Sequence, residues 1–424
     1  MAQSSHRLIA VRILSRVFQR RSTLEKEFQG KAFRSLQPKN RRFTTELVYG
    51  TLRRLKTLDF FIERLSDRSI DRIDAAIAWI LRISLYQLAW MRVPAHAVVS
   101  EAVDLCPAFR KSSAAGFVNA VLRSFSRERP SVPAGDTVRE AAVRWSHPEW
   151  LVAAYWDQFG RKAANRMMER NNQPPEPWLW INPFRIDRES FLVRLGEEVI
   201  SFSERPELEG CVRVDSPSFV LHQLYKTGAC FFMDPSSQKV ARMVPVESGG
   251  QVADLCAAPG GKSFILASRN KDRQPIVCAD ADFGRLMEMG ARAELYGIPN
   301  LQLVQADASR TLPVTARFDS ILLDVPCSGL GTIRRNPDIR WTFEPSQLTR
   351  FQRLQGAILR EGFRLLRKEG TLIYSTCSTM PQENEQVVAR FFSETPAARL
   401  EGSFFRSYPN SPDDSFFAAR IRRC

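Results

Sequence analysis

The chain has 424 residues, 44% of them hydrophobic, which is enough for more than one core, so we expect two or three domains. Lysine and arginine total 61 against 46 acidic residues, and the net charge of +15 favours a polyanionic partner such as nucleic acid. A basic protein without such a partner, or one bound at a membrane surface, is also compatible with this charge.

No run of about 18 apolar residues occurs, and residues 1–12 lack the apolar stretch of a secretory signal, so we expect a cytoplasmic protein that does not bind membranes. The eight cysteines are scattered without a C-x-x-C pair, and the four histidines lack metal-ligand spacing. We therefore expect no disulfides and no metal site. Any activated nucleophile is expected to be a thiol.

The first segment, from Leu8 to about Phe125, has apolar residues at helical spacing and predicts an all-helical domain over residues 1–130. Basic residues lie between the apolar stripes, and they indicate either a solvated helix face or an RNA-contacting face. These residues are Arg20, Arg21, Lys39, Arg41, Arg42, Arg53, Arg54 and Lys56.

A linker is predicted over residues 127–136, which hold two prolines and a glycine. The next segment, residues 137–233, is predicted to begin with a helix around Trp150 to Asn171. Short alternating runs follow at Trp178 to Asn182 and Ser218 to Leu221. This pattern favours a small α+β connector domain.

The last segment, residues 234–424, alternates short apolar runs with helical stretches, which predicts a doubly wound parallel sheet in an α/β Rossmann-like domain. The predicted strands are Val252–Leu255, Ile276–Ala279, Leu301–Val304, Ser320–Leu323 and Thr371–Tyr374. Ligands bind such sheets beyond the carboxyl ends of the strands. The segments at those ends are Asp254–Lys262, Asp280, Asp307, Asp324–Gly329 and Ser375–Ser378.

The turn after the first of these strands, Asp254–Lys262, is rich in small residues, so its backbone can approach a ligand closely. Its spacing differs from the G-x-G-x-x-G of dinucleotide sites, and a plain tight turn is the alternative. Asp280 ends the second strand, where a carboxylate can accept hydrogen bonds from a ribose diol, and Asp307 ends the third. Either aspartate could instead be a cap or a turn residue.

Three long motifs in this order resemble those of the NOL1/NOP2/Sun family of RNA cytosine-5 methyltransferases. They are Asp254–Lys262, Asp324–Gly329 with its sequel Arg334–Trp341, and Tyr374–Ser378 with Glu383–Glu385. Upstream, Arg42–Arg53 and Phe117–Arg123 resemble the NusB-like helical domain of the bacterial Sun/Fmu branch, which methylates 16S ribosomal RNA. The resemblance covers nearly the whole chain, and it implies a target of the cytosine-967 class.

Covalent catalysis explains why this chemistry needs a thiol. Carbon 5 of cytosine is too weak a nucleophile to attack a sulfonium methyl group, and a thiolate that adds at carbon 6 makes it enamine-like. An acid must relieve the charge that develops at N3, and Asp324 beside Cys327 is suitably placed for this task. The target base must also leave its stack to reach the thiol.

The spacing alone does not decide which cysteine attacks, because Cys327 and Cys377 both follow a predicted strand at the same edge of the sheet. The resemblance implies that the Thr-Cys thiol, Cys377, is the nucleophile and that Cys327 assists product release. In DNA cytosine-5 methyltransferases the Pro-Cys thiol attacks instead. An inert buried cysteine is the structural alternative for either residue.

The resemblance also implies a pocket for S-adenosylmethionine, the expected cofactor. Its residues are Cys256, Ala257, Ala258, Pro259, Gly260, Gly261, Lys262, Asp280, Arg285, Asp307 and Asp324. Lys262 and Arg285 could instead be surface residues. Cys256 and Cys278 each lie in a strand-like run, which indicates that their side chains pack in the core. The expected RNA contacts are Pro326, Arg334, Arg335 and Arg340, the arginines because cations there would meet phosphates.

Two positions depart from the family pattern. Trp180 stands where many relatives have arginine, and it is expected to be a core aromatic or, alternatively, to stack on a base. Asp414-Ser415 stands where relatives have Asp-Gly, which is expected to alter a turn and leave the chemistry intact.

The sequence therefore predicts a monomeric methyltransferase with 16S ribosomal RNA, free or in a partly assembled subunit, as its substrate. A transfer RNA cytosine-5 methyltransferase is the rival enzyme, because the motifs serve both. An RNA-binding assembly or antitermination factor with a decayed catalytic domain is the rival from another class. The joint presence of Cys327, Cys377 and Asp324 argues against decay.

Overall fold

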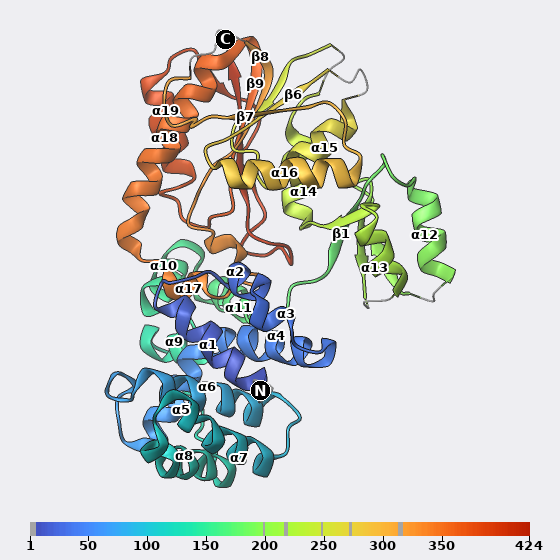
Figure 1. Ribbon diagram of the computed structural model, residues 1–424. Coiled ribbons are helices and arrows are strands. Elements are labelled where there is room, and N and C mark those ends of the chain that lie inside the picture. The colour runs from blue at the N-terminus through green and yellow to red at the C-terminus, as the bar shows by residue number, and fades with distance from the viewer. Residues whose placement is uncertain (1–5, 198–199, 216–218, 247–248, 271–273, 313–316) are drawn as a thin grey trace. The chain divides into compact units, whose positions relative to one another are not determined.

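The computed structural model in Figure 1 describes residues 6–197, 200–215, 219–246, 249–270, 274–312 and 317–424. Its contacts divide the chain into two compact units. Unit 1 consists of Met1–Pro174 and Ile333–Thr342, and unit 2 consists of Pro175–Thr332 and Phe343–Cys424. The chain thus re-enters unit 1 for ten residues before it completes unit 2. The domain boundaries expected from the sequence remain a prediction.

Unit 1 is built from helices, which confirms the all-helical prediction for Leu8 to Phe125. The α-helices of its first 127 residues are α1 (His6–Phe18), α2 (Leu24–Gln29), α3 (Lys31–Arg34), α4 (Pro38–Arg53), α5 (Leu55–Ser66), α6 (Ala75–Trp90), α7 (Ala95–Leu105) and α8 (Ala115–Arg127). Their apolar stripes meet in one core that includes Leu14, Leu47 and Phe61. Arg53 is buried beside this core and stacks over the Tyr49 ring. It therefore does not lie on a solvated helix face, which was one of the two expectations for the basic residues of this segment.

The stretch predicted as a linker has no helix or strand between α8 and α9 (Val138–Trp145), but the chain on both sides of it belongs to unit 1, so its role as a domain boundary remains a prediction. The predicted helix around Trp150 to Asn171 is present as two helices, α10 (Glu149–Phe159) and α11 (Arg161–Asn171). They are separated by Gly160, whose φ of 73° lies in the left-handed region. α17 (Ile339–Thr342) belongs to the segment that returns to unit 1.

Unit 2 contains a small antiparallel sheet in the order β2-β3-β1-β4. Its strands are β1 (Trp178–Ile181), β2 (Phe202–Glu204), β3 (Cys211–Val214) and β4 (Cys230–Phe232), and its helices are α12 (Arg188–Glu197) and α13 (Phe219–Lys226). This confirms the predicted α+β character and the strand at Trp178. The strand predicted for Ser218 to Leu221 is wrong, because α13 begins at Phe219 and buries Leu221 and Leu224 at helical spacing. Ser218 itself lies outside the described residues.

The second sheet of unit 2 confirms all five predicted strands as parallel neighbours in the order β7-β6-β5-β8-β9. These are β5 (Val252–Asp254), β6 (Ile276–Asp280), β7 (Leu301–Gln305), β8 (Phe318–Asp324) and β9 (Leu366–Thr376). The sequence did not predict the antiparallel strands β10 (Ala398–Leu400), β11 (Phe405–Arg406) and β12 (Phe417–Arg423), which extend the sheet beyond β9.

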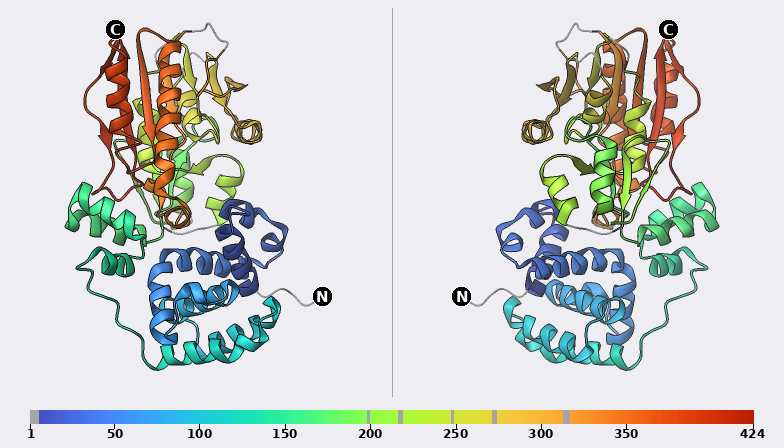
Figure 2. Two further views of the ribbon diagram at one scale, coloured as in Figure 1. Left: turned by 90° about the vertical axis from the view of Figure 1, so that its left-hand side faces the viewer. Right: turned by 90° about the vertical axis from the view of Figure 1, so that its right-hand side faces the viewer.

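Helices cover both faces of this sheet (Figures 1 and 2). One group is α14 (Pro235–Met243), α15 (Gly261–Arg269) and α16 (Phe283–Tyr296), and the other is α18 (Leu348–Leu365) and α19 (Glu385–Glu394). The strand order reverses direction at β5, between β6 and β8. In doubly wound sheets a ligand site lies at the carboxyl ends of such strands.

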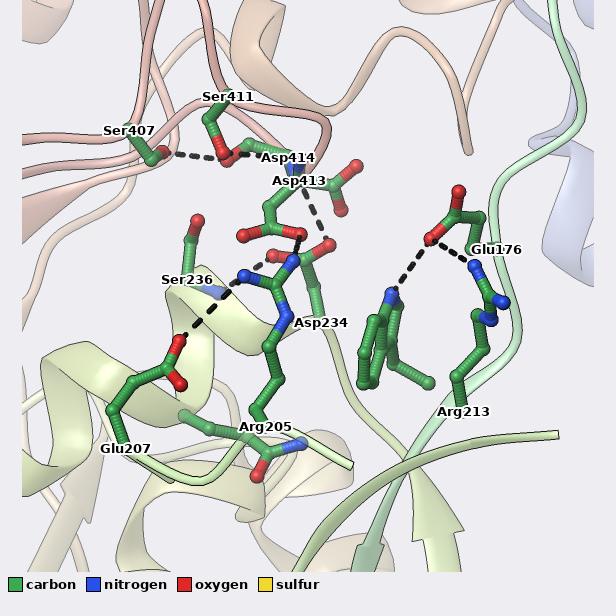
Figure 3. A network of polar contacts seen from close by, with 12 residues as sticks. Glu176, Arg205, Glu207, Arg213, Asp234, Ser236, Ser407, Ser411, Asp413 and Asp414 are labelled. Atoms are coloured by element: carbon green, nitrogen blue, oxygen red, sulfur yellow. Dashed lines mark hydrogen bonds and ion pairs between the residues drawn. The ribbon is translucent and has the colours of Figure 1, made fainter. Parts of the chain in front are cut away.

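A polar network holds the carboxyl-terminal loop of unit 2 in place (Figure 3). Asp234 caps α14 and its second carboxylate oxygen accepts the Asp414 N–H at 3.0 Å. Arg205 pairs with Asp413 at 2.6 Å. Burial, together with the nearby Asp234, raises the pKa of Asp413 to about 6. This network fixes the residue before Ser415.

None of the helices in the described ranges is long and apolar enough to cross a membrane.

Candidate active site

The turn between β5 and α15 has no room for larger side chains at its tightest point. Gly260 has a φ of 106°, a left-handed conformation that favours glycine. A Cβ there would lie 2.5 Å from the Phe264 ring and 2.9 Å from Met289. Within this turn Pro259 is exposed, while Ala257 and Ala258 are buried. Cys256 lies in the turn rather than in the strand and is half-buried, whereas Cys278 is buried within β6 as predicted.

Asp280, at the end of β6, fixes the backbone of this turn. One of its carboxylate oxygens accepts the Ala258 N–H at 3.1 Å, and the other accepts the Asp282 N–H at 3.0 Å. Arg285 donates to the Ala258 carbonyl and lies 3.7 Å from Asp280, although its side chain is half exposed. A carboxylate has about four acceptor positions, so Asp280 retains capacity for a further donor.

Asp307 follows the end of β7. It accepts hydrogen bonds from the backbone and the hydroxyl of Ser309, at 2.9 Å and 2.6 Å, and these bonds lower its pKa. Asp307 therefore makes the contacts expected of a turn residue. Its side chain is partly exposed, and its second carboxylate oxygen lies 3.3 Å from Arg310.

Asp254, the last residue of β5, is buried beneath the turn and accepts a hydrogen bond from the Ser263 hydroxyl at 2.7 Å. Burial raises its pKa from 3.8 to about 7. Between these two values the unfolded chain has lost the proton while the folded protein keeps it. Asp254 therefore lowers stability as the pH rises through this range.

We expect Asp254→Asn to remove this dependence, because the amide is nearly isosteric and does not titrate. The free energy of unfolding of the unaltered protein should fall between pH 4 and 7, by at most about 1.4 kcal/mol per pH unit from this residue. In the variant the fall should be shallower. Urea unfolding at pH 5, 6, 7 and 8 measures both slopes. Equal slopes would show that Asp254 does not titrate in this range.

Asp324, at the end of β8, joins two other elements of the site. The ammonium group of Lys262 donates to one carboxylate oxygen at 2.6 Å, and the Ser375 hydroxyl donates to the other at 2.7 Å. Burial opposes the charge of Lys262, but the adjacent Asp324 outweighs it, and the pKa of Lys262 is raised. Lys262 is thus a largely buried ion-pair partner, not a surface lysine. The sequence placed both residues in the site but did not predict that they pair.

The two cysteines meet at the ends of β8 and β9. The Sγ atoms of Cys327 and Cys377 lie 3.3 Å apart, and both residues are partly exposed. The hydrogen bond with Cys377, together with burial, raises the pKa of the Cys327 thiol well above its usual range. Cys377 also interacts electrostatically with Lys262. The structure therefore brings the predicted pair and Asp324 to one end of the sheet.

Gly331 is a site residue that the sequence did not single out. Its N–H donates to the Cys377 carbonyl at 2.8 Å, and its carbonyl accepts the Ser415 N–H at 2.9 Å. A Cβ at Gly331 would lie 2.0 Å from the Ser415 carbonyl oxygen and 2.7 Å from that of Cys377. The segment with the Asp414-Ser415 departure is thus packed directly behind the Cys377 turn.

We expect Gly331→Ala to displace the Cys377 turn, because both obstructing atoms belong to the backbone. A misplacement of about 1 Å at a reacting group can lower the rate about a hundredfold. Methylation rate and thermal unfolding should be measured together. Gly356→Ala is the control, since its Cβ would meet only the flexible Arg360 side chain at 3.6 Å. A Gly331 variant that matches this control in activity would refute the role of the close contact.

Gln355 in α18 was also missed. It is buried, and its amide donates to the Pro326 carbonyl and to the Glu383 carboxylate, each at 3.0 Å. The sequence does contain a signal for its burial, because Gln355 lies on the same helix face of α18 as the apolar residues Phe351 and Ile358.

The predicted RNA contacts differ in accessibility. Pro326 is exposed next to Cys327, whereas Arg334 and Arg335 are half-buried. Within unit 1, Arg334 donates to the Pro174 carbonyl at 2.9 Å. The prediction for Arg340 is contradicted, since its side chain is fully buried in unit 1.

The guanidinium of Arg340 has protein partners. It donates to the Ser146 carbonyl at 3.0 Å, to the Asn172 side chain at 2.8 Å and to the Asn171 carbonyl at 2.9 Å. Trp341, the next residue, donates from its indole nitrogen to the Leu52 carbonyl at 2.8 Å. The segment 333–342 is therefore an integral part of the helical unit, with Arg340 as its buried anchor.

Trp180 confirms the core-aromatic expectation. It is 2% exposed and packs against Phe231, with ring centroids 4.9 Å apart.

Comparison with protein families gives three matches. Residues 241–420 match the family described as 16S rRNA methyltransferase RsmB/F. Residues 4–127 match the NusB family, and residues 147–221 match a ferredoxin-like domain of RsmF/B-like methyltransferases. The order of these matches agrees with the predicted helical, α+β and Rossmann-like segments.

Comparison with individual proteins agrees. The chain is 34% identical to the probable ribosomal RNA small subunit methyltransferase B of Bacillus subtilis, over 85% of this chain and 82% of the relative. It is 32% identical to ribosomal RNA small subunit methyltransferase B of Cronobacter sakazakii, over 90% of each protein. The fold is similar to the crystal structure of PH0851, with a TM-score of 0.82, 20% identity, and coverage of 100% and 99% of the two chains.

Proposed function

This chain belongs to the RsmB/F family of 16S rRNA methyltransferases, and from that premise we propose that it methylates carbon 5 of a cytosine in 16S ribosomal RNA. A target of the cytosine-967 class is part of the proposal. The observation that carries it is the 3.3 Å separation of the Cys327 and Cys377 sulfur atoms beside Asp324. Two thiols and a carboxylate at one sheet edge suit covalent activation of a pyrimidine.

The residues of the first three strand ends fit S-adenosylmethionine, the proposed methyl donor. The β5–α15 turn is closed to side chains at Gly260, so its backbone can lie against a ligand. Asp280 and Asp307 keep acceptor capacity for hydroxyl or amino groups. When bound, this group supplies an electrophilic methyl. The residues proposed to hold it are Cys256 to Lys262, Asp280, Arg285, Asp307 and Asp324.

In the proposed reaction the Cys377 thiolate adds to carbon 6 of the target cytosine. Cys327, which its raised pKa keeps protonated, lies within hydrogen-bonding distance of that sulfur. We assign Asp324 to N3. As the thiolate adds, a proton passed from the Lys262 ammonium group through Asp324 would neutralise the charge that develops at N3, and the carboxylate would then accept a hydrogen bond from that N–H. After methyl transfer a base removes the carbon 5 proton, and Cys327 assists release of Cys377.

The proposed RNA contacts are Pro326, which is exposed next to Cys327, and Arg334 and Arg335, whose cations would meet phosphates. The net charge of +15 supports a polyanionic substrate. The protein is proposed to act in the cytoplasm, as a monomer and without a metal.

Bisulfite sequencing of ribosomal and transfer RNA from a strain that lacks the gene tests the function. The expected result is the loss of one modified cytosine in 16S ribosomal RNA, restored by the intact gene. Loss of a transfer RNA mark instead would show that the substrate is transfer RNA, as expected for the rival enzyme. If all marks persist, the chain is not the cytosine-5 methyltransferase proposed here.

A further inference from the structure

Glu383 is a fully buried carboxylate two residues before α19. One oxygen, Oε1, accepts the Ser328 N–H at 2.8 Å and the Gln355 amide at 3.0 Å. The other, Oε2, accepts the hydroxyls of Ser328 and Ser378. Four donors satisfy a carboxylate, which explains how this charge is accommodated away from water.

The two serines are the residues that directly follow the two cysteines. Ser328 follows Cys327 in the turn after β8, and Ser378 follows Cys377 in the turn after β9. Their Oγ atoms lie 3.0 Å apart against the same carboxylate oxygen. The two turns are therefore joined one residue beyond the thiols.

The backbone of Glu383 and the residues around it are also held by hydrogen bonds. Its backbone carbonyl accepts the Tyr374 hydroxyl of β9 at 2.6 Å, and Gln355 also donates to the Pro326 carbonyl at 3.0 Å. The neighbouring Asn384 accepts the Thr376 hydroxyl and donates to the Ser378 carbonyl at 2.9 Å. A charged acceptor held in this way sets the positions of both turns more firmly than a neutral one would.

We propose that Glu383 is a positioning residue that holds the Cys327 and Cys377 thiols together for the reaction. It acts through Ser328 and Ser378, one serine for each thiol. The distinct roles of the two thiols rest on the proposed function, whereas their juxtaposition does not.

Thiol oxidation tests the juxtaposition without RNA or methyl donor. Diamide takes two electrons and two protons from the thiols of Cys327 and Cys377, which join as a disulfide, and diamide becomes the hydrazine. Sulfur atoms 3.3 Å apart need little movement to bond, so we expect the unaltered protein to react quickly. Peptide mapping by mass spectrometry identifies this pair among the eight cysteines.

Glu383→Gln should slow this disulfide about tenfold. The glutamine carbonyl can still accept the Ser328 N–H, but its amide faces two hydroxyls in place of the charged oxygen. Glu383→Ala should slow the reaction further, and partial recovery in the glutamine variant would show that the hydrogen bonds, not merely the volume, position the thiols.

Glu361→Gln is the matched control. Glu361 is a buried glutamate of α18 that accepts the Leu312 N–H at 2.8 Å and pairs with Arg364, outside the cysteine turns. We expect it to keep the disulfide rate of the unaltered protein. Disulfide formation at that rate in the folded Glu383 variants would overturn the proposal, as would equal slowing in the Glu361 variant.

Single serine variants separate the two turns and keep the buried carboxylate. Ser378→Ala should lower the yield of covalent protein–RNA adduct, whereas Ser328→Ala should prolong the lifetime of the adduct. Identical effects of the two variants on both quantities would overturn the assignment of one serine to each thiol. If the unaltered protein does not methylate RNA at all, the proposed function fails, and the oxidation rates still decide the positioning role.

Discussion

Cys377→Ala is expected to abolish methylation and to form no covalent protein–RNA adduct. The thiolate is the group that makes carbon 5 nucleophilic, and loss of a covalent nucleophile lowers turnover by at least about a thousandfold. Cys327→Ala should also lose turnover, but it should accumulate the adduct, since addition remains possible while release is impaired. Denaturing gels with labelled RNA, beside single-turnover methylation, distinguish the two results.

The control for these variants is Cys278→Ala, which removes a buried thiol from β6, outside the turns that carry Cys327 and Cys377. It should keep methylation and differ only in stability. Adduct in Cys377→Ala and none in Cys327→Ala would exchange the two roles. Full activity in both variants would exclude covalent catalysis by either thiol.

The second large effect is expected for Asp324→Asn. The amide keeps the shape but loses the charge that pairs with Lys262 at 2.6 Å, and it is a poorer acceptor for a protonated N3. Positioned acid–base groups contribute about a hundredfold to ten-thousandfold, and we expect a loss in this range. In a Cys327→Ala background the same change should slow adduct formation, which places Asp324 at the addition step.

Asp319→Asn provides the comparison, because Asp319 lies at the other end of β8, where it pairs with Arg367 on the surface. Its activity should stay within about twofold, as surface ion pairs contribute little. An Asp324 variant that is equally active would remove Asp324 from the mechanism. An intact addition rate with slow release would move it to a later step.

The sequence predicted the parallel sheet well because strands buried on both faces are short apolar runs and their polar ends stand out. Four of the five strands, including β8 with Asp324 at its end, followed from this contrast, and β7 was predicted from its apolar run although it lies at the edge of the sheet and is only partly buried. The apolar run from Ser218 to Leu221 is too short to distinguish a strand from a helix. Its described residues belong to the helix α13. The antiparallel strands β10 to β12 were missed because nothing local separates them from loops.

Within the site, the sequence could predict which residues gather but not how they pair. Lys262 and Asp324 are 62 residues apart, and only the fold places the ammonium group on the carboxylate. For Arg340 the prediction from the sequence was wrong. A cation in a basic segment indicates a surface position, but Arg340 is buried against partners that lie 168 to 194 residues earlier in the chain. Burial of a charge depends on distant contacts that no local pattern records.

The ten-residue return of the chain into unit 1 has a consequence for how such proteins change during evolution. A gene fusion or exchange at a single junction near Pro174 would bring in new helices without the matching stretch 333–342. Arg340 would then lose acceptors such as the Asn172 side chain and would be left as an uncompensated buried charge. The helical unit and the stretch after the Cys327 turn are therefore expected to be inherited together, and substitutions in one to be matched in the other.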